Sequence, residues 1–152
     1  MRRRLIPLTA LTTMGWLAQS AGAAPSPDTP MASRWHVGST WAVLVFAPDH
    51  QLVGSMVVRI TNEKAISCIS GDWKRLELVR REFKDPADFL ATKPLSYLLD
   101  GSELTLGVTE VCDGYVLLHG VPTNEGLAGD YGTLGLGGFH KLGSFAAVIV
   151  KE

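Results

Sequence analysis

The fold class of this chain is indicated most clearly by a series of short runs rich in Val, Ile, Leu and aromatic residues. Turn-forming residues interrupt these runs roughly every ten positions, a spacing typical of all-β sandwiches and barrels. β-Branched and aromatic side chains suit strands, whereas Gly, Pro, Asn and Asp suit turns. We therefore predict an all-β domain: a single antiparallel barrel or closed sandwich of eight or nine strands, with at most one short helical turn.

The individual strand predictions follow the runs between turns. The predicted strands cover residues 41–46, 52–61, 65–70, 73–81, 95–99, 102–106, 111–121, 127–136 and 141–150. The clearest local signal is Asp100-Gly101, because Asp-Gly supplies the positive backbone angles that a tight hairpin turn needs. Residues 85–90 are the candidate helical turn, since Asp85 suits a helix cap and Pro86 suits a first helical position.

Alternation within the second predicted strand indicates which of its faces is buried. Side chains two positions apart on a strand point to the same side of the sheet. The more apolar face is therefore expected to point inward. It consists of Leu52, Gly54, Met56, Val58 and Ile60.

Most of the 16 glycines lie in the last third of the chain, and Gly129, Gly132, Gly135 and Gly138 recur at every third position. The chain lacks the glycine patterns that cradle nucleotide phosphates. Glycine also relieves crowding where strands bend sharply or approach each other closely, and a sheet that coils into a closed barrel needs such points. We therefore interpret these glycines as packing positions.

The N-terminus has the three regions of a secretory signal peptide. Three arginines at positions 2–4 precede a largely apolar stretch, and Ala21-Gly22-Ala23 matches the small-x-small cleavage pattern. The apolar stretch is too short and interrupted for a membrane span of about 20 residues. We predict a cleaved signal peptide over residues 1–23, a flexible Pro-rich leader over 24–33 and a barrel domain over 34–152. The expected location is the periplasm or the exterior, without membrane insertion of the mature form.

The charge of the chain excludes one class of partner. The formal net charge is −1 at pH 7, and loss of the N-terminal arginines makes it more negative. Such a chain has no electrostatic basis for binding nucleic acid or anionic membranes. Basic and acidic residues alternate between positions 74 and 85, which is typical of a solvated, salt-bridged face; a patch for an anionic partner is the alternative.

Cys68 and Cys112 are the only cysteines. Two lone thiols in an exported protein usually pair. On the chain-entropy model, a disulfide that closes a loop of this length stabilises the fold by roughly 4 kcal/mol. The alternatives are a redox pair or metal ligands, but Cys-x-x-Cys spacing is absent and two cysteines alone cannot form a structural zinc site. We predict a structural disulfide.

No catalytic or cofactor motif is evident. The Gly-x-Ser-x-Gly pattern of a serine nucleophile does not occur, and the four histidines are scattered along the chain. A metal site could still assemble in space from His119, His140 and Asp130, but lone histidines are far more often surface or satisfied core residues. We predict no metal, no cofactor and no enzymatic activity. An enzymatic function would regain support if His119 or His140 lay beside an acidic residue inside a pocket.

Gly38-Ser39-Thr40-Trp41 opens the first predicted strand. It resembles the Gly-x-Trp motif of lipocalins and related calycin barrels, with one extra residue between Gly38 and Trp41. In those barrels the tryptophan plugs one end, so the resemblance implies a small secreted barrel. Small bacterial periplasmic protease inhibitors share a comparable barrel that begins with a tryptophan. The aromatic residues expected at the barrel plug or mouth are Trp41, Trp73, Tyr115 and Tyr131.

Two functions remain open. The first is a non-catalytic binding protein that holds a small apolar ligand in the barrel interior. The alternative is a protein-binding module, such as a periplasmic inhibitor or an envelope accessory protein. The interior volume distinguishes them, because a ligand needs a cavity of roughly 300 Å³ or more, whereas a solid core favours a protein partner.

Overall fold

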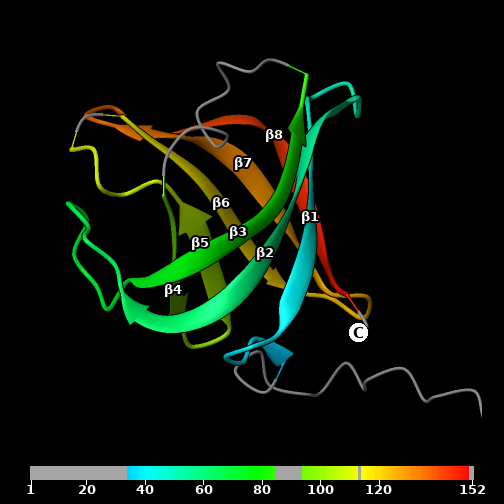
Figure 1. Ribbon diagram of the computed structural model, residues 1–152. Coiled ribbons are helices and arrows are strands. Elements are labelled where there is room, and N and C mark those ends of the chain that lie inside the picture. Colours follow the sequence, from blue (N-terminus) through cyan, green and yellow to red (C-terminus); the bar gives the residue numbers. More distant parts are fainter. Residues whose placement is uncertain (1–33, 85–93, 113, 151–152) are drawn as a thin grey trace, which may run out of the picture.

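The computed structural model describes residues 34–84, 94–112 and 114–150, which form one closed antiparallel barrel of eight strands (Figure 1). The strands are β1 (Thr40–Phe46), β2 (Leu52–Lys64), β3 (Lys74–Phe83), β4 (Leu95–Asp100), β5 (Glu103–Gly107), β6 (Tyr115–Pro122), β7 (Leu127–Gly135) and β8 (Gly138–Ile149). Each strand pairs with its neighbours in sequence, and β8 pairs with β1 to close the barrel. The predicted all-β barrel is confirmed, and it is compatible with a lipocalin-like fold.

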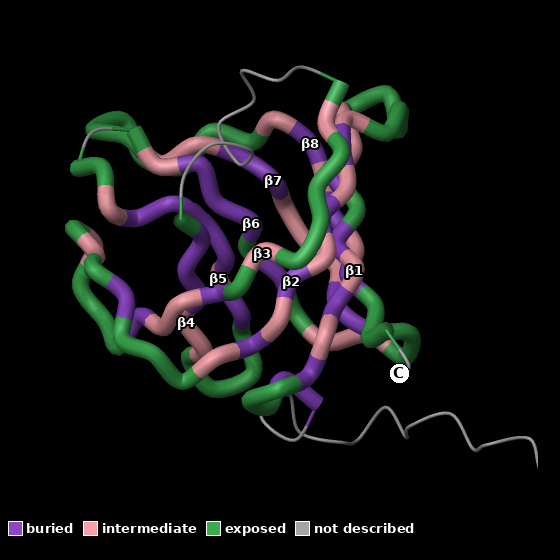
Figure 2. Tube along the Cα trace, viewed as in Figure 1, coloured by how far each residue is buried: buried purple, intermediate pink, exposed green. Residues whose placement is uncertain are grey.

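Buried residues alternate with more exposed ones along β1 and β2 (Figure 2), and the buried side chains form the core of the barrel. On β1, Trp41, Val43 and Val45 are completely buried, whereas the intervening Leu44 is exposed. The buried residues of β2 are Gly54, Met56, Val58 and Ile60, as predicted. Leu52 was expected on the same face but is exposed, because it is the first residue of its strand and lies at the end of the barrel.

Aromatic rings fill the interior at points where glycines leave room for them. A Cβ atom placed on Gly120 would lie 2.5 Å from Cζ of Phe145, and one on Gly54 would lie 2.2 Å from the Phe83 ring. Rings from β8 and β3 therefore occupy space that other side chains would otherwise fill. The interior is a packed core, which is one of the two outcomes that eight strands allow.

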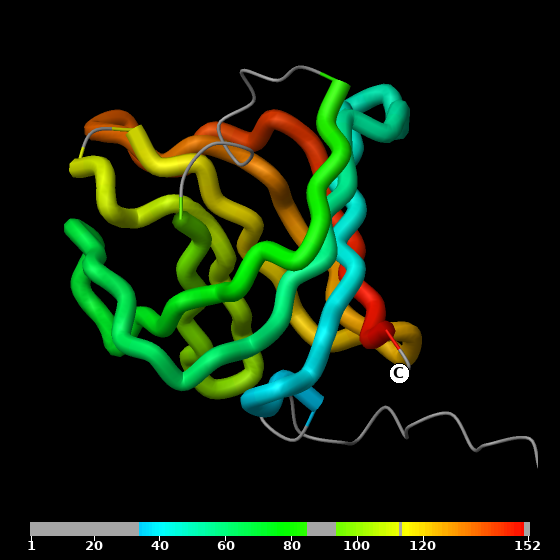
Figure 3. The backbone as a smooth tube through the Cα atoms, viewed as in Figure 1, coloured from blue at the N-terminus to red at the C-terminus, as the bar shows by residue number. Residues whose placement is uncertain are grey.

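The segment that precedes β1 lies at one end of the barrel (Figure 3), and Trp35 in this segment belongs to the core cluster. Its ring centroid lies 5.0 Å from that of Trp41 and 5.8 Å from that of Tyr97. Nη1 of Arg34 donates a hydrogen bond of 2.9 Å to the carbonyl oxygen of Thr123. This bond ties the segment before β1 to the connection between β6 and β7. Trp35 is therefore held by this bond on one side and by its covalent link to β1 on the other.

The predicted strand at residues 65–70 is wrong. These residues belong to the connection between β2 and β3, residues 65–73, which we call the flap. The backbone N–H of Cys68 donates to the carbonyl oxygen of Thr109 over 2.8 Å. The flap does not form a strand because its backbone bonds to a loop and not to a neighbouring strand.

The Asp100-Gly101 hairpin is confirmed, and Gly101 has the expected positive φ of 59°. The strand predicted to start at residue 111 instead starts at Tyr115, which leaves Cys112 in the loop between β5 and β6. The predicted helical turn, signal peptide and leader lie outside the described residues. Within the described part of the chain, no helix has the length and apolarity that a membrane crossing requires.

Candidate functional site

Two of the four aromatic residues expected at the barrel plug or mouth lie in the packed core. Trp41 is completely buried, and its Nε1–H donates to Oγ of Ser39 over 3.1 Å. Tyr131, on β7, is also buried in the core. These two side chains therefore help to fill the barrel, and neither offers an open surface to a partner.

Trp73 is the last residue of the flap and does not belong to the core cluster of the barrel. It is almost completely buried, and its Nε1–H donates to the carbonyl oxygen of Ser70 over 3.2 Å. A Cβ atom on Gly71 would lie 3.1 Å from the side chain of Leu98, so the flap packs against β4. The flap thus forms a small second cluster with Leu98 on the outer side of β4, because the neighbouring Tyr97 and Leu99 face the core.

The predicted disulfide between Cys68 and Cys112 is confirmed, with Cα atoms 5.2 Å apart. It joins the flap to the loop between β5 and β6. Both cysteines are exposed to solvent. The disulfide therefore clamps two surface loops together and does not cross the barrel core.

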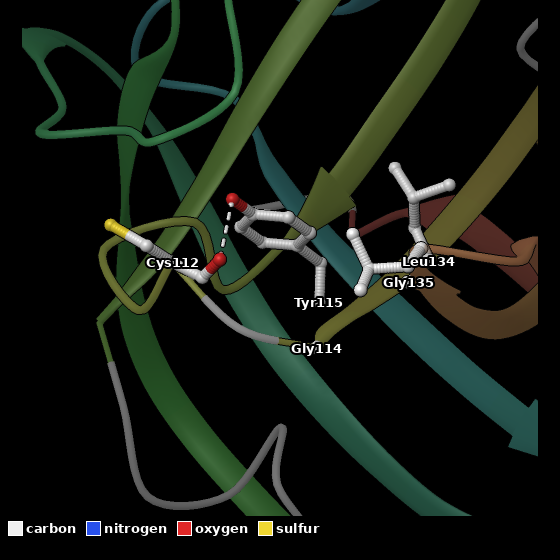
Figure 4. Close-up of a pocket in the computed structure, with 6 residues that line it drawn as sticks. Cys112, Gly114, Tyr115, Leu134 and Gly135 are labelled. Carbon is white, nitrogen blue, oxygen red and sulfur yellow. Dashed lines mark hydrogen bonds between the residues drawn. The ribbon is translucent and has the colours of Figure 1, made fainter.

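Tyr115 lies on the outer side of β6 beside a hollow of about 520 Å³, which we call the Tyr115 hollow. The residues that line it are Cys112, Gly114, Tyr115, Leu134, Gly135 and Leu136. Figure 4 shows the tyrosine ring between Cys112 on one side and Leu134 with Gly135 on the other. The phenolic O–H donates to the carbonyl oxygen of Cys112 over 3.3 Å, so the disulfide-bonded loop forms one wall of the hollow.

A second hollow, of about 330 Å³, lies on the outer side of β5 to β8, and we call it the Phe139 hollow. The residues that line it are Thr105, Leu117, His119, Asp130 and Phe139. Strand register brings them together, because Thr105 pairs with His119 and His119 pairs with Asp130. Residues from four consecutive strands thus meet in one place on the sheet.

Glycines shape the floor of the Phe139 hollow. A Cβ atom on Gly107 would lie 2.6 Å from the Leu117 side chain, and one on Gly132 would lie 2.5 Å from the Phe139 ring. Leu117 and Phe139 therefore lie close against the sheet where glycines leave space. As a result Leu117 is only 6% exposed although it points outward, whereas Phe139 keeps 44% of its surface exposed.

A polar row borders this apolar floor. Nδ1 of His119 lies 3.1 Å from Oγ1 of Thr105, and Nε2 of His119 lies 3.6 Å from a carboxylate oxygen of Glu103. On the neighbouring strands, Nζ of Lys141 lies 2.6 Å from a carboxylate oxygen of Asp130. The row carries charges of both signs beside apolar and aromatic side chains.

The two hollows adjoin each other on one outer surface. Tyr115 pairs with Leu134, and Leu134 pairs with Phe139, so these three side chains form a row across β6, β7 and β8. We call the surface formed by Tyr115, Leu117, Leu134, Leu136 and Phe139 the β6–β8 face. Leu136, at the turn between β7 and β8, is fully exposed.

His119 does lie beside an acidic residue at a hollow, which is the arrangement that would favour an enzyme. However, the His119 and Glu103 side chains are 48% and 58% exposed, so water surrounds both. Polar neighbours of this kind are common cross-strand pairs on a solvated sheet surface. The arrangement is better explained as the polar border of the hollow. Within the described ranges, no group of three His, Cys, Asp or Glu residues could hold a metal ion.

The sequence singled out Tyr115, His119 and Asp130, but Leu117, Leu134 and Phe139 were not predicted as parts of this surface. The run Tyr115-Val116-Leu117-Leu118 is apolar throughout, so alternation alone does not show which side chains point outward. Phe139 follows two glycines and lay outside every predicted strand. The pairing of Asp130 with His119 was visible only after the register was known.

Comparison with known proteins does not identify the chain: no family model matches it, and neither a curated protein nor a solved structure is significantly similar to it.

Proposed function

We propose that this chain is an exported, non-catalytic protein-binding module that uses the β6–β8 face. The main support for this proposal is the difference between the inside and the outside of the barrel. Its interior is filled by side chains, whereas its outer surface has two adjoining hollows with aromatic walls. A partner that binds this barrel therefore finds more accessible apolar surface outside than inside.

The packed interior is the first support. Phe145 and Phe83 fill the space beside two glycines, and Trp35 covers one end. An apolar ligand would have to displace these rings, at a cost comparable to opening the core. The expectation of a ligand in the interior remains a prediction, but this packing does not favour it.

The composition of the β6–β8 face is the second support. Protein interfaces commonly have an aromatic or aliphatic centre and a polar border, and a few residues in the centre contribute most of the binding energy. Here Tyr115, Phe139 and Leu134 form the centre, while His119 and Asp130 stand at the border. Scattered exposed apolar residues are ordinary, whereas a continuous apolar row across three strands supports the proposal of an interaction surface.

The disulfide and the fold support the remaining parts of the proposal. A disulfide in a small domain is typical of oxidising compartments, which agrees with export to the periplasm or beyond. Membership of the lipocalin family is proposed from the barrel and from the motif that ends at Trp41. In this proposal the chain keeps the lipocalin-like barrel but binds its partner on the outside.

Peptide selection tests where the protein binds. A random peptide library would be selected on the oxidised protein, and the affinities of the selected peptides measured for the wild type and for Tyr115→Ala and Phe139→Ala. We expect each substitution to weaken binding by about tenfold, as a buried aromatic contact at an interface would. The matched control is Val79→Ala, because Val79 is a similarly exposed apolar residue on β3.

Peptides that are insensitive to both aromatic substitutions would contradict the proposed face. Native mass spectrometry of the protein from its source would test the interior separately. A small apolar molecule that remains bound to the intact barrel would favour the ligand-binding function instead. Thermal unfolding of each variant would establish that it is folded before affinities are compared.

A further inference from the structure

We infer that Cys68–Cys112 is a thiol-exchange site, and that its reduction loosens the flap and one wall of the Tyr115 hollow while the barrel stays folded. This goes beyond the proposed function, and its readouts do not depend on whether the β6–β8 face binds a protein. The inference rests on three properties of the disulfide: its accessibility, the few other contacts that hold the flap, and the position of Cys112 in the hollow.

The disulfide is accessible from solvent. Cys68 lies in the flap and Cys112 in the loop between β5 and β6, and both residues are exposed. Exchange requires a thiolate to reach one of the two sulfur atoms, so access is a first condition for reactivity. A disulfide buried in the barrel core would not meet this condition, but a pair on two surface loops does.

Few non-covalent contacts hold the flap in place. Of its residues 65–73, only the first and the last, Ala65 and Trp73, are buried, and Ile66 is 68% exposed. Two hydrogen bonds join the described residues of the flap and the β5–β6 loop: Cys68 N–H donates to the carbonyl oxygen of Thr109, and Thr109 Oγ1 donates to the carbonyl oxygen of Ile66. Segments with so few buried contacts open locally at low free-energy cost. The disulfide is therefore the covalent link between the exposed middle of the flap and the β5–β6 loop, whereas the buried Trp73 fixes the end of the flap next to β3.

The barrel does not depend on this tether in the same way. Hydrogen-bonded pairing runs continuously from β1 to β8 and back to β1, and neither cysteine lies on a strand. The core cluster of the barrel includes neither Trp73 nor the two cysteines. Reduction should therefore act on the two loops before it acts on the sheet.

Opening the flap would change the surface in two places. The hydroxyl groups of Ser96 and Thr109 lie 2.8 Å apart and are buried, and Thr109 is joined to the flap by the bonds described above. Water would reach this pair once the flap moved. Cys112 also lines the Tyr115 hollow and accepts the tyrosine hydrogen bond, so release of its loop would alter that wall.

The reaction requires a dithiol partner, such as a protein with two neighbouring cysteines. One partner thiolate attacks a sulfur of the Cys68–Cys112 bond, forms a mixed disulfide and releases the other cysteine as a thiolate. The second partner thiol then displaces the mixed disulfide. Two electrons and two protons pass to this protein, and the partner becomes the disulfide.

Hydrogen exchange read by mass spectrometry tests the inference, with dithiothreitol as the dithiol. After reduction under native conditions, we expect amides of residues 65–73 and 110–112 to exchange at least about tenfold faster, because the tether that restricts local opening is lost. Amides of β1 and β8 should stay far better protected than those of the flap, and they should accelerate only through global unfolding, which becomes less costly once the loop constraint is lost. Both thiols should also become alkylated by iodoacetamide without denaturant.

A Cys68→Ser/Cys112→Ser variant provides the control. It should show the fast loop exchange without dithiothreitol and no further change with it. Unchanged exchange in the flap after complete reduction would overturn the inference, and so would exchange in β1 and β8 that becomes as fast as exchange in the flap. Resistance of the disulfide to dithiothreitol in the folded protein would overturn it as well.

Discussion

On both the inner and the outer side of this barrel an aromatic ring packs over a glycine, but the inner ring is buried and the outer ring is exposed. Inside, the Phe145 ring lies over Gly120 and is 2% exposed; outside, the Phe139 ring lies over Gly132 and is 44% exposed. In both places a glycine on one strand makes room for an aromatic ring from another. A ring that packs over a glycine inside the closed sheet therefore stabilises the fold, whereas the same arrangement on the outside leaves the ring accessible to a partner.

Removing the inner ring should have the largest effect. Phe145→Ala leaves a cavity among fully buried neighbours, so we expect the free energy of unfolding to fall by about 3–5 kcal/mol. Urea denaturation followed by circular dichroism would measure this change. A loss below about 1 kcal/mol would mean that the two rings are energetically alike, and the comparison would then fail.

Filling the outer glycine should have the next largest effect. A Cβ atom on Gly132 would lie 2.4 Å from the carbonyl oxygen of His140 and 2.5 Å from the Phe139 ring. Gly132→Ala should therefore destabilise the protein by about 1–3 kcal/mol, as overpacking does, and displace the ring. Gly135→Ala is the matched control, because its Cβ would meet nothing within 4 Å. Equal effects of the two substitutions in thermal unfolding would contradict the close fit of Phe139 over Gly132.

The buried Tyr97 on the inner side should make the stability of the protein depend on pH. Burial, with a smaller contribution from the charge of Asp72, raises the pKa of Tyr97 above its ordinary value of 10.0. The folded state then holds the phenolic proton more tightly than the unfolded state does. The stability that this confers is complete below pH 10 and is lost as the pH rises through the raised pKa.

Tyr97→Phe should remove this alkaline loss. It should also cost about 1 kcal/mol at neutral pH, because the hydroxyl donates a hydrogen bond of 2.8 Å to the carbonyl oxygen of Thr61. Urea denaturation at intervals between pH 8 and 11 would compare the two proteins. If the wild type and the variant lost stability in parallel over this range, Tyr97 would not be the responsible group.

The smallest effect on stability should come from the outer ring. Phe139→Ala removes a half-exposed side chain, so we expect a change in unfolding free energy of less than about 1 kcal/mol. The same substitution is expected to weaken peptide binding by about tenfold. Urea denaturation and affinity measurements on one preparation would test both. A large stability loss together with unchanged binding would assign Phe139 to the fold and not to the site.

Much of the fold could be predicted from local sequence signals. Asp100-Gly101 specifies a tight turn wherever two strands flank it, and the alternation from Gly54 to Ile60 identifies a buried face without knowledge of the partner strand. The pairing of Cys68 with Cys112 needed only their number and the compartment. These predictions succeeded because each depends on a few neighbouring residues or on composition.

The tertiary structure alone decided the site. Register places Leu117 and Phe139 beside two glycines from other strands, and barrel closure sends Phe145 inward while Phe139 stays outside. The sequence of the flap predicted a strand, but in the structure the backbone N–H of Cys68 bonds to the carbonyl oxygen of Thr109 in a loop. The physical reason is that apolar side chains carry no information about their partners. Only the assembled sheet determines which of them are covered and which remain open to water.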